Sequence, residues 1–134
     1  MTQEFVTYEQ ALALKELGFD EKCFTVYNGT NILIRLTGKN VGWCFIDEVE
    51  LIKHNSSVGS LGVSAPLKQQ AFRWFREKYK YDHSIVMMKH PFGTDEYQYL
   101  ILLNEDEYVK TGFNTYEEAE QACLDKLIEI CKNK

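Results

Sequence analysis

The sequence has 134 residues, of which 45% are hydrophobic and 26% charged, and its formal net charge at pH 7 is −5. A chain of this length and composition can bury a sizeable core, which excludes the disordered class and proteins that need a metal or disulfides to fold. No stretch approaches the ~20 apolar residues of a membrane span, and residues 1–5 lack the features of a signal peptide. The sequence therefore favours a cytoplasmic protein without membrane partners.

Near the amino end, the sequence predicts a short helix with a clear start and stop. Thr7 and Gln10 have the spacing of a capping box, in which each side chain bonds the backbone amide of the other residue. Gly18 supplies the left-handed residue that ends a helix, and Phe19 can fold back on Leu14. This helix is expected to lie on a core.

A β-meander is predicted next. Residues 23–27 and 32–36 are aromatic and β-branched enough to be strands, and Asn28-Gly29 between them favours a tight hairpin turn. Residues 41–46 are predicted as a third strand, which residues 47–52 either extend or follow with a short helical turn.

Residues 53–64 are rich in Ser, Gly and Asn and are predicted as a loop, acting as a hinge or a flap. The segment contains no phosphate-binding glycine motif. The sequence predicts a single α+β domain, residues 1–134. Two subdomains, 1–52 and 65–134, joined by this loop, are the alternative.

An aromatic helix is predicted over residues 66–80. Pro66 suits its first turn, with Ser64 or Ala65 as the cap. Its apolar face includes Trp74 and Phe75, and a face this heavy must be buried. The prediction is that Trp74 is a core residue.

The opposite face of that helix is the most basic stripe in an acidic protein, and it is the candidate interaction surface. Four side chains are expected to share one exposed helical face, with Lys68 flanking it. They are Gln69, Arg73, Arg76 and Lys80. Such a stripe could bind phosphates, contact a partner protein or remain solvated.

The second half is predicted to contain three strands and a helix. The strands are residues 84–88, 97–103 and 108–111, and the second should lie centrally because its end is apolar on both faces. Thr115 and Glu118 form a second capping-box pattern, which begins a helix that continues to about residue 131.

The predicted fold is therefore α+β, with antiparallel β-meanders and helices on one face. The order is αβββ in residues 5–46 and αβββα in residues 65–131. The second order is similar to that of double-stranded-RNA-binding domains, which carry phosphate-gripping lysines at the start of their last helix. Glu117, Glu118 and Glu120 stand there in this sequence, and they argue against RNA binding.

Three blocks of sequence resemble small uncharacterised proteins carried by bacteriophages, prophages and mobile elements of gut Bacteroidetes. The blocks are Thr7 to Asp20, Ala65-Pro66-Leu67 leading to Trp74 to Tyr79, and Thr115 to Ala119. They consist of helix caps and core faces. The resemblance implies a phage or mobile-element origin and brings no catalytic residues.

No catalytic or metal-binding pattern emerges. The three histidines and four cysteines have no metal-ligand spacing, and Cys23, Cys44, Cys123 and Cys131 are predicted to be reduced and inert. The acidic clusters 47–50 and 105–107 are typical of solvated turns. Tyr97 and Tyr99 could stack on bases as RNA-binding platforms do, but core packing or a partner interface explains the same tyrosines and is favoured. We expect no catalytic site, cofactor or metal.

The favoured hypothesis is a non-enzymatic interaction module that binds an unidentified protein and could be a homodimer. The alternative is a nucleic-acid-binding accessory protein that uses the basic face of helix 66–80, which the net negative charge disfavours. A small enzyme of unrecognised type is the third reading, and the absence of a motif places it last.

Overall fold

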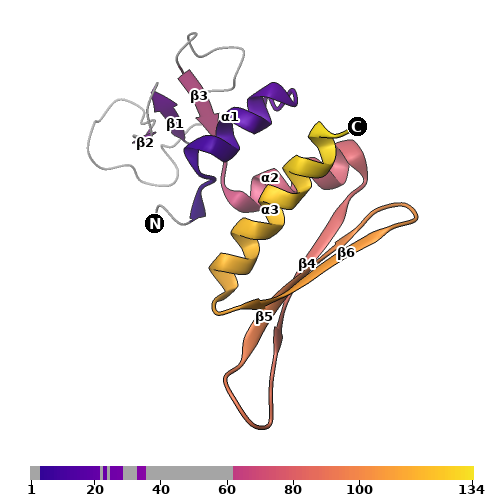
Figure 1. Cartoon of the computed structure of the whole chain (residues 1–134). Helices are drawn as coiled ribbons and strands as arrows, with labels where there is room; N and C mark the ends of the chain where they lie inside the picture. Colours follow the sequence, from indigo (N-terminus) through magenta and orange to yellow (C-terminus); the bar gives the residue numbers. More distant parts are fainter. Residues whose placement is uncertain (1–3, 22, 24, 29–32, 36–61) are drawn as a thin grey trace. The chain divides into compact units, whose positions relative to one another are not determined.

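The computed structural model describes residues 4–21, 23, 25–28, 33–35 and 62–134 (Figure 1). It confirms the α+β class, with helices and antiparallel sheets in alternating order. The chain forms two compact units, Met1–Gln69 and Gln70–Lys134, called here the first and second units. The boundary between them lies at the start of helix α2 (Lys68–Tyr79), and most of the predicted joining loop, residues 53–64, lies outside the described residues.

Helix α1 (Tyr8–Glu16) begins and ends as predicted. Thr7 Oγ1 accepts a hydrogen bond from the Gln10 amide at 3.1 Å, and Gln10 Oε1 accepts one from the Thr7 amide at 2.9 Å. Gly18 has a φ of 97°, and the Phe19 amide donates to the Leu14 carbonyl at 2.9 Å. The helix termini are thus satisfied by local hydrogen bonds.

The first sheet has the order β2-β1-β3 and is antiparallel. Strand β1 (Thr25–Asn28) pairs with β2 (Leu33–Arg35), which confirms the predicted pairing of the first two strands. Most of the turn at Asn28-Gly29 and all of the predicted elements 41–46 and 47–52 lie outside the described residues.

The third strand comes from a segment that was predicted to be loop. Strand β3 (Gly62–Ala65) pairs with β1 over its whole length, and Thr25 Oγ1 donates to the Ala65 carbonyl at 3.0 Å. Small residues favour strands only weakly, but here pairing with β1 and packing against α1 outweigh that preference. The rest of the predicted loop, residues 53–61, lies outside the described residues.

Helix α2 spans Lys68–Tyr79, so it begins later than the sequence predicts. Ser64 and Ala65 are strand residues and not caps. The Pro66 carbonyl accepts a hydrogen bond from the Val6 amide at 3.1 Å, which holds Pro66 outside the helix. The predicted core face is confirmed, because Ala71, Trp74 and Phe75 are all buried, as is Phe72.

The second sheet is antiparallel with the order β4-β5-β6. Its strands are β4 (Asp82–Met88), β5 (Glu96–Leu102) and β6 (Glu107–Phe113), and α3 (Tyr116–Lys132) follows. The predicted αβββα order of the second half and the central position of β5 are confirmed. Thr115 Oγ1 caps the Glu118 amide at 3.1 Å, whereas the Glu118 carboxylate bonds the Asn114 amide and so does not complete the capping box.

Both helices of the second unit contact the same face of this sheet, as predicted. Helix α3 packs on β5 over the buried side chains of Tyr99 and Ile101, and Figure 1 shows it running along one side of the sheet. Phe72 of α2 stacks on His83 of β4 at a centroid distance of 3.7 Å. His83 pairs with Ile101 in the register, so it belongs to that face as well.

Candidate interaction surface

Neither α2 nor α3 covers the other face of the second sheet. Because side chains alternate along a strand, the sequence neighbours of the helix-covered residues point the opposite way. The apolar side chains on this outer face are Val86, Met88, Leu100, Leu102 and Val109. All of them except the half-buried Leu100 are exposed, and Val109 is 52% exposed. Leu100 pairs directly with Val109, so the apolar side chains are neighbours across the strands.

The charged residues of this outer face all carry the same sign. They are Asp82, Glu96 and Glu107, and no strand residue on this face is basic. Asp82 lies 4.0 Å from the Arg76 guanidinium, and Glu96 lies 3.4 Å from His90. The outer face is therefore an apolar strip with an acidic rim.

The β4–β5 hairpin extends this apolar surface. Met87 belongs to the helix-covered face by register, yet it is 42% exposed, so both faces of the hairpin are open near its end. Phe92 in the connecting loop is 97% exposed. Figure 1 shows the hairpin as a long arm that continues beyond the first turn of α3.

The predicted basic stripe is smaller than expected. Gln69, Arg73 and Arg76 are exposed on α2. Lys68, the first residue of the helix and a member of the first unit, is only 4% exposed. Lys80 has a φ of 65° and follows the helix as its left-handed terminating residue, so it does not extend the helical face.

Two arginines are therefore the only strong cations that the stripe retains on the helix, and Arg76 approaches Asp82. Two phosphate contacts would give a salt slope of roughly −2 and little affinity at physiological salt. Tyr97 and Tyr99 also lie on the helix-covered face, against Tyr116 and Phe113 respectively. These positions do not suit base stacking.

Among the described titratable groups, the large pKa shifts are caused by burial and do not make the groups more reactive. Burial raises the pKa of Cys23 and of Cys123 to about 12 and that of Cys131 to about 11. Such thiols are poor nucleophiles. His83 has its pKa lowered to about 4, first by burial and then by Arg76. Among the described residues, no three His, Cys, Asp or Glu side chains gather as a metal site would require. Cys44, His54 and the acidic cluster 47–50 lie outside them.

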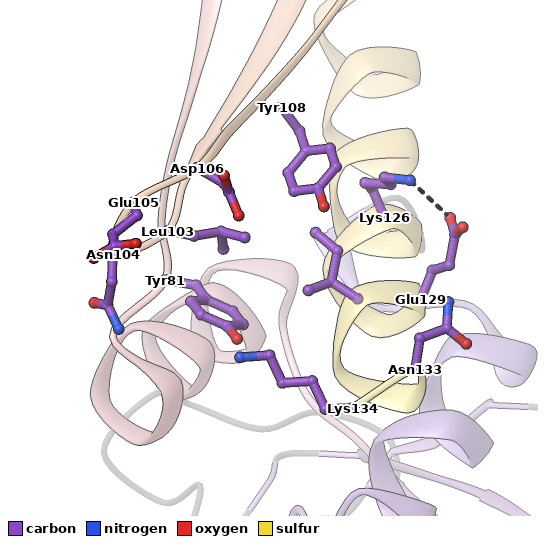
Figure 2. Close-up of a pocket in the computed structure, with 11 residues that line it drawn as sticks. Tyr81, Leu103, Asn104, Glu105, Asp106, Tyr108, Lys126, Glu129, Asn133 and Lys134 are labelled. Atoms are coloured by element: carbon purple, nitrogen blue, oxygen red, sulfur yellow. Dashed lines mark hydrogen bonds and ion pairs between the residues drawn. The ribbon is translucent and has the colours of Figure 1, made fainter.

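A cavity of about 680 Å³ lies in the second unit (Figure 2). It is bounded by Tyr81, by residues 103–106 of the β5–β6 turn with Tyr108, and by the last turns of α3. Its wall carries both carboxylates and lysines, including the ion pair between Lys126 and Glu129 at 3.3 Å.

Sequence reasoning missed both the outer face and this cavity. An apolar strand end indicates burial on two faces, but periodicity does not say whether a second layer is present to cover them. The cavity lies between a turn and the carboxyl end of a helix that begins ten or more residues later in the sequence. No local sequence motif predicts that these two segments lie close together.

No family model, curated protein or solved structure matches this chain. Within the described residues, no helix combines the length and the apolar character that crossing a membrane requires.

Proposed function

We propose that this chain is a non-enzymatic protein-interaction module that binds a partner protein through the outer face of the sheet β4-β5-β6. The single observation that carries the proposal is the exposed apolar strip on that face. Monomeric proteins rarely leave large contiguous apolar surface open unless it meets a partner. The resemblance of its helix caps and core blocks to phage proteins supports an origin in a bacteriophage or mobile element. Among the described residues, Cys23, Cys123 and Cys131 are free thiols, which supports a cytoplasmic site of action.

Several apolar side chains of the outer face and its hairpin would become more buried when a partner binds. Fully burying a Val, Leu or Met side chain is worth about 1.5–3 kcal/mol, so the half-exposed Val86, Leu102 and Val109 would each gain roughly 1 kcal/mol. Phe92 would gain more, since it is almost completely exposed. Methionines such as Met87 and Met88 adapt to irregular partner surfaces.

The charges of the rim identify the kind of partner. Two copies of this face brought together would bring Asp82, Glu96 and Glu107 close to one another, and Arg76 beside Asp82 and His90 beside Glu96 offset these charges only in part. Like charges across an interface disfavour association. The face therefore fits a different protein, with an apolar surface flanked by lysines or arginines.

The test compares capture from nuclease-treated host lysate by the parent and by the double variant Val86→Lys with Val109→Lys. Gln121→Lys on the exposed side of α3 is the matched control. The parent and the control should capture the same protein, the double variant should lose it, and binding of the purified partner should weaken with added salt.

Light scattering and circular dichroism accompany this comparison. Unchanged spectra establish that the variants are folded. Capture that survives in the double variant would contradict the proposal. A parent dimer that Val86→Lys with Val109→Lys dissociates would show instead that a second copy occupies the face. Capture that depends on nucleic acid would favour the basic helix.

A further inference from the structure

We propose that the cavity between the β5–β6 turn and the carboxyl end of α3 binds an alkylammonium group. The group would come from a lysine side chain of a peptide or from a free polyamine. The site is separate from the outer face of the sheet, because Tyr108 belongs to the opposite, helix-covered face by register.

Two ammonium groups of the chain already lie against the aromatic walls of this cavity. The Lys134 Nζ is 5.0 Å from the centroid of the Tyr81 ring, and the Lys126 Nζ is 5.0 Å from the centroid of the Tyr108 ring. Both distances are within the range of cation–π attraction. The cavity thus has the geometry to hold an ammonium group over a tyrosine.

The two lysines differ in what else holds them. Lys126 is fixed by its ion pair with Glu129 at 3.3 Å. Lys134 makes no carboxylate ion pair with any described residue and is fully exposed to solvent. Figure 2 shows its side chain extended toward Tyr81. Lys134 is therefore the displaceable occupant, and an incoming ammonium would take its position.

The Tyr81 hydroxyl provides an acceptor for that ammonium. Tyr81 is only 3% exposed, and its hydroxyl is buried with no partner at hydrogen-bond geometry. Its interaction with Lys134 raises the pKa of Lys134, but it falls short of that geometry. A buried hydroxyl without a full partner is costly, so a ligand that completes the hydrogen bond is favoured.

The charge balance of the wall selects a cation. The carboxylates of Glu105, Asp106 and Glu129 outnumber the two lysines, and displacement of Lys134 increases the negative excess to two. Glu105 and Asp106 form no ion pair within the described part of the chain. The carboxyl end of α3 adds the partial negative charge of its last carbonyls.

The experiment is an NMR titration of the full chain with three probes: N-acetyl-lysine methylamide, spermidine and inorganic phosphate. A fragment-sized cation should bind with a dissociation constant of about 1–10 mM. The expected shifts are confined to amides of residues 81, 103–108 and 126–134. Tighter binding of N-acetyl-lysine methylamide than of spermidine would identify a peptide lysine as the source, and the reverse order would identify a polyamine.

Three variants make the result decisive. Lys134→Gln should tighten binding of the lysine probe by roughly 3- to 10-fold, because it removes the competing ammonium. Asp106→Asn should weaken it by a similar factor, and Glu117→Gln on the first turn of α3 should leave it unchanged. The gain expected for Lys134→Gln cannot arise from a loss of folding.

The proposal is overturned if the cationic probes shift no cavity amide up to about 20 mM. It is equally overturned if Lys134→Gln weakens binding, if Asp106→Asn and Glu117→Gln behave alike, or if phosphate is the only probe that binds.

Discussion

The stacked pair of His83 and Phe72 makes the stability of the second unit sensitive to mild acid. The His83 ring lies 3.7 Å from the Phe72 ring, centroid to centroid, with the planes inclined by 12°. Burial, reinforced by the Arg76 guanidinium and opposed by Asp82, lowers the pKa of His83 from 6.5 to about 4. The folded state therefore takes up the histidine proton less readily than the unfolded chain does.

The sign and size of the effect follow from linkage. Stability is fully present above pH 6.5 and is lost as the pH falls toward 4, because protons then bind preferentially to the unfolded state. Each pKa unit corresponds to about 1.4 kcal/mol, and the partial solvent access of the ring reduces that figure. We expect a loss of about 1–2 kcal/mol at pH 5.

Urea unfolding at about pH 7.5 and pH 5 measures this loss, and the urea midpoint of the parent should fall by roughly 1 M. His83→Phe keeps an aromatic ring against Phe72 and removes the titrating group, so its midpoint should change much less between the two pH values. His90→Gln, in the exposed hairpin loop, is the control and should behave like the parent. Equal losses for the parent and His83→Phe would refute the reasoning.

Two further predictions concern the core and the thiols. Trp74→Ala should lower the free energy of unfolding by about 3–5 kcal/mol, since the side chain is buried. Phe92→Ala should change it by less than about 0.5 kcal/mol, because Phe92 is exposed. Equal urea midpoints for the two variants would contradict the assignment of Trp74 to the core. Iodoacetamide should leave Cys23, Cys123 and Cys131 unmodified in the native protein and react with them once it is unfolded, because burial raises their pKa values. Mass spectrometry counts the adducts. Rapid alkylation of the native protein would contradict the burial of these thiols.

The features that could be predicted best from the sequence are those that local hydrogen bonds determine. The cap at Thr7 and the stop at Gly18 involve partners within five residues, so their side chains suffice to specify them. Strand β3 depends instead on a partner 40 residues away, and only Val63 among its four residues favours a strand by itself. The late start of α2 has the same cause, because the Val6 amide bonds the Pro66 carbonyl from the far end of the first unit.

The candidate surfaces were harder to predict for a different reason. The spacing of Lys68 and Lys80 suited an exposed helical face, but the burial of one and the left-handed backbone of the other depend on where the helix actually begins and ends. The exposure of Val109 depends on the absence of a covering layer in the second unit. Neither property is encoded in the periodicity of a single element.

The pairing of β1 with β3 also bears on how the chain folds during synthesis. In the second unit, each strand pairs with a neighbour in sequence, so its sheet can form from successive hairpins. The first sheet cannot close until residues 62–65 have left the ribosome, although β1 was made about 35 residues earlier. Contacts between distant residues slow folding, whereas local contacts speed it. Amino-terminal segments ordinarily fold first because they are synthesised first. We expect the second unit to fold faster than the first, which reduces the difference in the times at which the two units are folded.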